Sequence, residues 1–245
     1  MSKHKIGWLN RPGTTGETWN PITGCSPVSA GCLNCYAARM AKRFGESHGY
    51  PADEPFRVTF HPDRLERPSR WKKPKTIFVC SMGDLFHEDV EAPWVYRVLE
   101  EACFCEHHTF IVLTKRPKRM ATVMSHEPIV LPNLWLGVTA EDQAAADERV
   151  PLLLKTPAAV RWVSVEPMLE ETDLAMLVDD LDWVVIGCES GPRRRPCKPE
   201  WVEALVEQCQ EAGVAVYVKQ LDLGGAVSKD PDEWPEELRI REWPK

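Results

Sequence analysis

The sequence predicts an α/β fold built on a parallel (β/α) barrel, a partial one with about six strand–helix units. Two observations support this prediction. Short runs rich in β-branched residues recur from Lys75 onward, and amphipathic helical stretches separate them. The runs are apolar throughout instead of alternating, which is typical of parallel strands covered on both faces. A flat, doubly wound sheet is the alternative architecture.

The expected strands follow one another along the second half of the chain. They cover residues 76–80, 109–114, 134–139, 160–165, 182–188 and 214–219. Apolar residues recur at helical spacing between them, as in 95–103 and 202–209. One or two further units are expected nearer the N-terminus.

We expect a single domain over residues 1–245 with three distinctive segments. Residues 19–36 form a cysteine-bearing loop, and residues 45–75, rich in proline and charge, form an insertion at the barrel rim. A short strand at 57–60 and a short helix near 62–65 are expected within the insertion. The tail, residues 222–245, is acidic and contains tryptophans and prolines.

Composition excludes several classes of protein. The net charge of −7 argues against a nucleic-acid binder that relies on bulk positive charge, although a local basic patch remains compatible with it. No apolar run is long enough to span a bilayer and the N-terminus lacks the apolar core of a signal peptide, so we expect a cytoplasmic protein with no membrane partner. Nine cysteines, an odd number, favour metal binding or catalysis over a disulfide framework.

Cys25, Cys32 and Cys35 are spaced C-x6-C-x2-C in a turn-rich loop. A helix is expected to begin near Asn34 or Cys35, with Asn34 as a plausible N-cap. The dipole and the free amide groups at a helix N-terminus favour a thiolate there. Such a loop can fold around a metal and deliver its last ligand from a rigid element.

Three closely placed cysteines predict a [4Fe–4S] cluster, because three thiolates leave one of four irons open to an outside ligand. S-adenosylmethionine (SAM) can chelate that iron through its amino and carboxylate groups. One electron then cleaves SAM to a 5′-deoxyadenosyl radical, chemistry that belongs to the cofactor. The alternative is a zinc site whose fourth ligand is His48, His61 or Cys197.

The chain resembles the phage-associated, radical-SAM-like family of unknown function. The resemblance runs over most of the chain, in the blocks WNPITGC, GCLNCYAARMAKR, FHPDRL, SMGDLFHEDV, FIVLTKRP, LWLGVTAEDQ, VRWVSVEPML, DWVVIGCESGP and VYVKQ. It implies a radical-SAM-like barrel and a cluster-and-SAM cofactor class. The family's activity is not established, so the resemblance implies no substrate.

Polar residues follow the expected strands, where the working residues of an α/β barrel lie. By analogy of position, Ser81, Gly83 and Asp84 resemble a motif that meets the SAM amino group. The other candidates for SAM are Lys115 or Arg116 for its carboxylate, Glu141 or Asp142 for its ribose, and Glu166 and Glu189 for SAM or substrate. The competing interpretation is that strand ends are polar because they enter loops, and that such residues cap the next helix.

Two further cysteines, Cys80 and Cys188, end two of the expected strands. They are candidates for catalytic groups that donate hydrogen atoms to a substrate radical. With Cys197 they could instead form a second metal site. We favour the interpretation that they are small core thiols, and we interpret Cys103, Cys105 and Cys209 as packing residues.

Two basic rim loops, residues 115–119 and 193–195, would suit a phosphate-bearing substrate such as a nucleotide or nucleic acid. A charge run is more often a solvated face.

The leading hypothesis is a radical SAM enzyme that needs an electron donor and acts on an unknown substrate. The second is a non-catalytic, metal-containing module that binds nucleic acid or protein. The third is a metal-independent enzyme using Asp84, His87 and Glu166 as acid–base groups.

Overall fold

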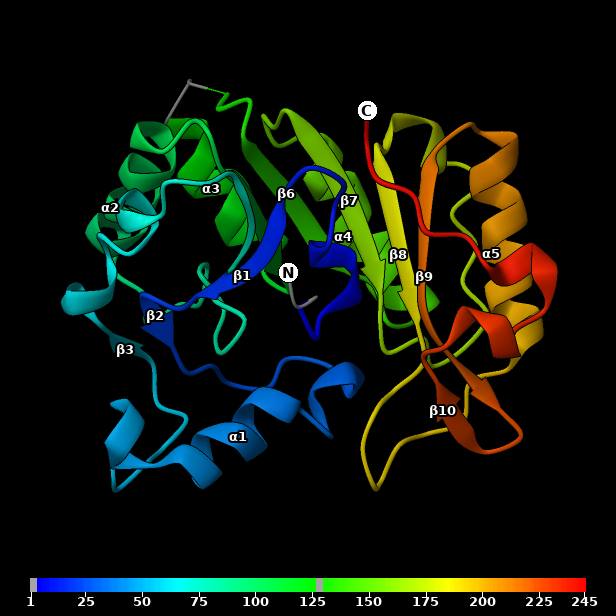
Figure 1. The fold of residues 1–245 in the computed structure, drawn as a ribbon, viewed down its shortest axis with the longest axis horizontal. Coiled ribbons are helices and arrows are strands. Elements are labelled where there is room, and N and C mark those ends of the chain that lie inside the picture. Colours follow the sequence, from blue (N-terminus) through cyan, green and yellow to red (C-terminus); the bar gives the residue numbers. More distant parts are fainter. Residues whose placement is uncertain (1–3, 127–129) are drawn as a thin grey trace.

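A curled sheet of eight strands organises the chain, in the order β1-β4-β5-β6-β7-β8-β9-β10 (Figure 1). This structure is a computed structural model that describes residues 4–126 and 130–245. Every neighbouring pair from β1 to β9 is parallel, and β10 runs antiparallel to β9. The sheet forms a half-barrel, so the predicted partial parallel barrel is confirmed.

The strands lie close to their predicted positions. Their bounds are β1 Thr15–Trp19, β4 Lys75–Val79, β5 Thr109–Thr114, β6 Leu134–Thr139, β7 Val160–Val165, β8 Trp183–Gly187, β9 Ala215–Leu223 and β10 Ala226–Ser228. Apolar runs predict the three central strands without error because both faces of those strands are buried. β9 extends beyond its prediction, and its last residues pair with β10.

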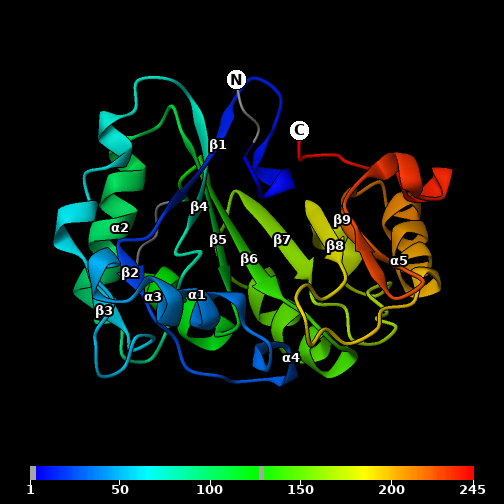
Figure 2. The same ribbon diagram turned by 60° about the horizontal axis from the view of Figure 1, so that its bottom comes forward.

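Four α-helices cover the convex face of the sheet (Figures 1 and 2). They are α2 Ala92–Phe104, α3 Pro117–His126, α4 Gln143–Leu154 and α5 Pro199–Glu211. The connection from β7 to β8 is described throughout and contains a 3-10 turn, Val178–Asp180, where an α-helix was expected. The strand–helix alternation is therefore interrupted at this one crossover.

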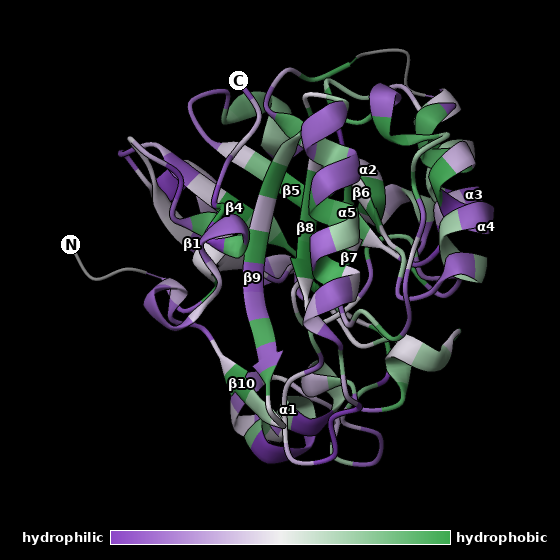
Figure 3. Cartoon of the chain, turned by 90° about the vertical axis from the view of Figure 1, so that its right-hand side faces the viewer, coloured by the Kyte–Doolittle hydropathy of each residue, from purple (hydrophilic) through white to green (hydrophobic). Residues whose placement is uncertain are grey.

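Side chains of the strands alternate between two cores. In β5, Phe110 and Val112 pack toward the helices, while Ile111 and Leu113 point into the hollow of the half-barrel. Aromatic rings dominate the hollow, namely Trp8, Trp135, Trp162, Trp183 and Tyr217. Figure 3 shows the hydrophobic strands behind the more hydrophilic outer surface of α5. Burial on both faces explains why the strand sequences are apolar throughout.

The two ends of the chain complete this aromatic core. Trp8, in the 3-10 turn Gly7–Leu9, lies with its ring 5.5 Å from that of Trp162 and 5.9 Å from that of Trp183. The indole N–H of Trp243 donates to the Trp8 carbonyl at 2.7 Å. The open side of the half-barrel is thereby partly filled by segments from both ends.

Helix α1, Tyr36–Phe44, lies along the edge of the sheet where the strands end (Figures 1 and 2). After it come the 3-10 turns Glu46–His48, Pro62–Arg64 and Pro68–Arg70. Strand β2, Ile22–Thr23, which precedes α1, pairs antiparallel with β3, Thr59–Phe60, which follows it. The strand expected at 57–60 is thus shorter, and the helix expected near 62–65 is a 3-10 turn. The tail contains the turns Pro231–Glu233 and Glu236–Leu238.

None of the helices formed by residues 4–126 and 130–245 combines the length and hydrophobicity that a bilayer-spanning segment requires.

Candidate functional site

Gly24 brings the first cysteine to the carboxyl edge of the sheet. Its φ of +89° favours glycine, and a Cβ here would lie 2.1 Å from the Arg57 carbonyl oxygen. The Gly24 N–H donates to Met82 O at 2.9 Å, and the next N–H, that of Cys25, donates to Phe56 O at 3.0 Å. The backbone leading into the cysteine is therefore fixed between the loop after β4 and the segment that precedes β3.

Cys25, Cys32 and Cys35 line one wall of a cavity of about 430 Å³ at this edge. The facing wall comes from inward positions at the ends of β6, β7, β8 and β9, including Thr139, Ser164, Glu166, Glu189 and Lys219. Trp8 and Phe78 also line it, at the top of the aromatic core. The cavity is apolar on the side of the aromatic core and polar at the carboxyl edge of the sheet. A cavity of this size and lining is typical of a site for a small molecule or cofactor.

Glu141 holds the middle of the cysteine loop to the end of β6. One carboxylate oxygen accepts from the Ser29 hydroxyl and, at 3.3 Å, from the Gly31 N–H. The other accepts from Lys115 at 2.6 Å and from Arg149 at 2.8 Å. Burial alone would raise the pKa of Glu141, but Lys115, Ser29 and Arg149 outweigh it and hold the pKa at about 2. Glu141 is thus a fully engaged anchor of the loop.

Glu189 holds the other side of the loop from the end of β8. Its carboxylate accepts from the Asn34 side-chain amide at 3.1 Å and forms a two-point ion pair with Arg195. Arg195 in turn donates to Ala30 O at 2.9 Å. The prediction that Asn34 caps α1 is wrong: Cys35 occupies the N-cap position, and the Asn34 amide is directed to Glu189 and Arg193 O.

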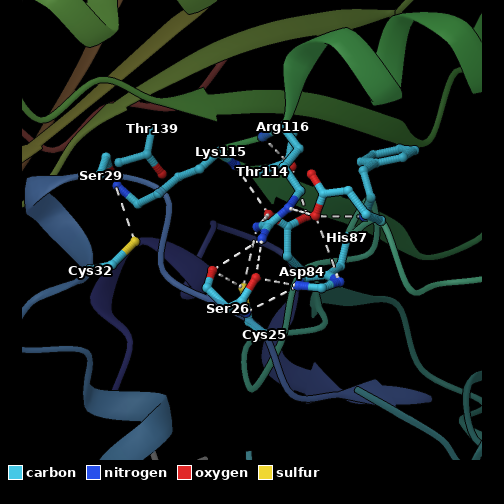
Figure 4. Close-up of polar contacts among 12 residues, drawn as sticks. Cys25, Ser26, Ser29, Cys32, Asp84, His87, Thr114, Lys115, Arg116 and Thr139 are labelled. Atoms are coloured by element: carbon cyan, nitrogen blue, oxygen red, sulfur yellow. Dashed lines mark hydrogen bonds and ion pairs between the residues drawn. The ribbon is translucent and has the colours of Figure 1, made fainter. Parts of the chain in front are cut away.

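The Arg116 guanidinium connects Cys25 to the end of β4 (Figure 4). It donates to the Cys25 sulfur at 3.3 Å, to Asp84 at 3.2 Å and to Glu88 at 2.7 Å. It also donates to the carbonyl and hydroxyl oxygens of Ser26, each at 3.1 Å. Arg116, which the sequence offered as a partner of the SAM carboxylate, therefore binds two protein carboxylates and a thiol.

Asp84 and His87 complete this group. Asp84 accepts from the Thr114 hydroxyl at 2.7 Å and from the Lys115 N–H at 3.2 Å. The Nε2 of His87 lies 2.7 Å from the Ser26 hydroxyl (Figure 4). Burial, and then the Arg116 charge, lower the pKa of His87, which favours a neutral ring at neutral pH.

The three thiols share a cavity but are not drawn together as in a finished metal site. Within the described part of the chain, no three histidine, cysteine, aspartate or glutamate side chains are grouped closely enough to hold a metal ion. Burial and the Asp84 charge raise the pKa of the Cys25 thiol to about 11, against a lowering effect of Arg116. Metal binding at Cys25 would therefore release a proton.

The thiols should differ in their reactivity in metal-free protein. We expect iodoacetamide to label exposed Cys103 first and Cys25 at least about tenfold more slowly at neutral pH, because the thiolate is the reacting form. Buried Cys209 should react only after unfolding. Peptide mass spectrometry over a time course would measure these rates. Equal rates for Cys25 and Cys103 would contradict this description of the Cys25 environment.

The remaining predicted site residues have differing locations. Ser81, Gly83 and Glu166 line the cavity, where Glu166 pairs with Lys219. Asp142 caps α4 by accepting from Ala145 N at 2.8 Å and does not line the cavity, in agreement with the competing interpretation of strand-end residues. Sequence reasoning missed Ser29, Arg149 and Tyr36, whose hydroxyl donates to Ser81 O. Ser29 and Tyr36 act through partners 112 and 45 residues away, and Arg149 reaches back eight residues from α4 to Glu141, so no local motif identifies the three.

The two strand-end cysteines differ. Cys80 lines the cavity although it is almost wholly buried, and burial raises its thiol pKa to about 12. Cys188 is fully buried and does not line the cavity, which agrees with the favoured interpretation of a core thiol and not with the candidate role of a catalytic group. It lies in the core near Cys197, and burial raises the pKa of both thiols to about 12.

The fold and the cavity together define the class of this protein. It is an α/β half-barrel protein whose small-molecule cavity is lined by a three-cysteine loop. Within that class, the chain belongs to the DUF5131 family of proteins of unknown function, which it matches over residues 4–238. No curated protein matches the chain. Among solved structures, it is similar to a cysteine-to-serine mutant of spore photoproduct lyase, with a TM-score of 0.43 and 10% identity over 86% of this chain and 71% of that one.

Proposed function

We propose that the protein is an iron–sulfur enzyme in which Cys25, Cys32 and Cys35 hold a [4Fe–4S] cluster beside bound SAM. One observation carries this proposal: three thiols from one loop face a single small-molecule cavity at the carboxyl edge of a parallel half-barrel. A fourth cysteine, Cys80, also lines the cavity, but it is almost wholly buried. The three thiolates of the loop suit a cluster with one open iron.

The donor set fits the cluster, and the loop can bring it together. The segment between Cys25 and Cys35 has one 3-10 turn, Ala30–Cys32, and no strand pairing to the main sheet. The side chains of Glu141 and Glu189 hold it instead. Drawing the thiols toward a common centre therefore requires rearrangement of side-chain contacts and leaves the sheet intact.

The chain's own residues would bind, orient and enclose the ligands. Lys219 and Glu166 pair with each other in the cavity, and an amino acid would exchange this pair for contacts of its carboxylate with Lys219 and of its amino group with Glu166. Arg116 stabilises the thiolate of Cys25 through its N–H to sulfur contact. Trp8 and Phe78 exclude water from below. When bound, the cluster would supply the electron for reductive cleavage of SAM.

Anaerobic purification tests the proposal. We expect a brown protein containing iron and sulfide, which releases 5′-deoxyadenosine when it is reduced in the presence of SAM. Metal analysis and chromatography of the reaction mixture are the measurements. Stoichiometric zinc without iron would contradict the proposal and favour a non-catalytic metal-containing module. Iron and sulfide uptake without SAM cleavage would support the cluster and contradict the proposed SAM chemistry.

A further inference from the structure

A second hollow, a groove of about 1280 Å³, continues from the cavity along the edge of the half-barrel. Lys5, Tyr36 and Ser81 line both the groove and the cavity, so the two are adjoining. The groove runs between β1, α1 and the turns after α1, which lie together at one side of the sheet (Figures 1 and 2). Its volume exceeds the roughly 300–1,000 Å³ typical of small-molecule pockets.

Two arginines give the groove an unbalanced positive charge. Among the ion pairs formed by the described residues, none includes Arg64 or Arg67. The groove's carboxylates are Glu17, which pairs with Lys75 at 3.3 Å, and exposed Asp63. Two neighbouring guanidiniums without paired carboxylates are well suited to an anion with several oxygens, such as a phosphate.

The Arg64 guanidinium is fixed in place before any ligand arrives. It donates to His48 O at 2.7 Å and to Asn20 O at 3.4 Å. Burial, and then the like charge of Arg67, lower the pKa of Arg64. An anion bound between the two arginines would offset that repulsion.

Most cations of the basic rim loops that the sequence suggested for phosphate are paired within the protein. Their cations pair with carboxylates in five cases: Lys115, Arg116, Lys118, Arg194 and Arg195. These side chains support the cysteine loop or the surface and offer little uncompensated charge. Arg119, which donates to Val90 O, and exposed Arg193 form no ion pair among the described residues, but each stands apart from a second unpaired rim cation in sequence, whereas Arg64 and Arg67 line one groove together.

Aromatic rings lie beside the arginines. Phe44 stacks on His48 with centroids 4.7 Å apart and on Tyr50 with centroids 6.3 Å apart. Tyr36 is 45% exposed where the groove meets the cavity, and its hydroxyl donates to Ser81 O, which fixes the ring. Rings next to cations are the usual elements of sites that bind unpaired nucleotides.

We propose that this groove binds a nucleotide unit, free or within a single strand, with its phosphate at Arg64 and Arg67 and its base against the aromatic rings. The proposal rests on the proposed function in one respect: the groove leads the substrate to the cavity where that chemistry would occur. It identifies the substrate class as nucleotide-bearing.

The test measures binding of an end-labelled oligothymidylate by fluorescence anisotropy, with thymidine monophosphate and inorganic phosphate as competitors. Arg67→Gln is the test variant because Arg67 is exposed and its side chain forms no hydrogen bond or ion pair with the described residues. Arg70→Gln is the matched control, three residues further on, exposed and outside the groove. We expect Arg67→Gln to weaken binding at least about fivefold and Arg70→Gln to leave it nearly unchanged.

Displacement by thymidine monophosphate would support a free nucleotide as the ligand, and binding of the oligomer alone would support a single strand. No binding by the parent protein, or equal affinities of the two variants, would overturn the proposal. Iron content and SAM cleavage measured on the same preparations separate this outcome from failure of the proposed function. If preparations without iron still bind the oligomer more weakly as Arg67→Gln than as Arg70→Gln, only the proposed function would be overturned, and the nucleotide groove would stand.

Discussion

Replacing Cys25, Cys32 or Cys35 with alanine is expected to reduce the iron content of anaerobically purified protein at least about tenfold. Each thiol is one of three ligands, and a cubane held by two is readily lost. The expectation follows from the shared cavity that the three residues line. Iron and sulfide analysis of the purified variants is the measurement.

Two other cysteines provide matched controls. Cys103 is exposed on α2, so its interpretation as a packing residue is wrong, and Cys209 is fully buried on α5; both lie away from the cavity. Cys103→Ala and Cys209→Ala should retain the iron content of the parent. Equal losses in all five variants would show that the iron is not held by the loop. Full iron content in the Cys25, Cys32 and Cys35 variants would do the same.

Replacing Glu141 with alanine is expected to lower the free energy of unfolding by about 3–5 kcal/mol. The Glu141 side chain is fully buried, and its removal leaves Lys115 and Arg149 without their shared carboxylate. Glu148→Ala, in the helix α4 that follows Glu141, is the control, because its pair with Lys118 is exposed and should contribute at most about 1 kcal/mol. Urea denaturation followed by circular dichroism measures both losses, and equal losses would contradict the prediction.

Acid should reproduce part of this effect. The folded-state pKa of Glu141, about 2, lies below the ordinary value for glutamate, about 4.3. Its contribution to stability is therefore complete above pH 4.3 and is lost as the pH falls toward 2. The difference between parent and Glu141→Ala should shrink over that range. A difference that stays constant down to pH 2 would contradict the assigned pKa.

The sheet could be predicted from sequence because its signal is local. Residues 109–114, 134–139 and 160–165 are apolar on both faces, and each became a strand with the predicted bounds. The crossover from β7 to β8 was misjudged because a regular alternation was extended over a segment that forms only a 3-10 turn. Two-residue strands such as β3 carry too few side chains to show a period.

The site was predicted less completely because its contacts join distant parts of the chain. Asn34 has the local features of a helix cap, but its amide reaches Glu189, 155 residues away. Ser29 reaches Glu141 across 112 residues. Glu141 was identified as a site residue from its position after a strand, but its role as an anchor of the loop depends on partners that spacing cannot reveal.

The hydrogen bond between Trp243 and Trp8 has a consequence for how the protein is made. The two residues are 235 positions apart, yet Trp8 lines the candidate site and packs on the rings inside the half-barrel. During synthesis, Trp8 leaves the ribosome 235 residues ahead of Trp243 and cannot form this contact until Trp243 has followed. Contacts of such long range form slowly. The base of the cavity is thus among the last parts to be completed, and a nascent chain would expose its tryptophans until then.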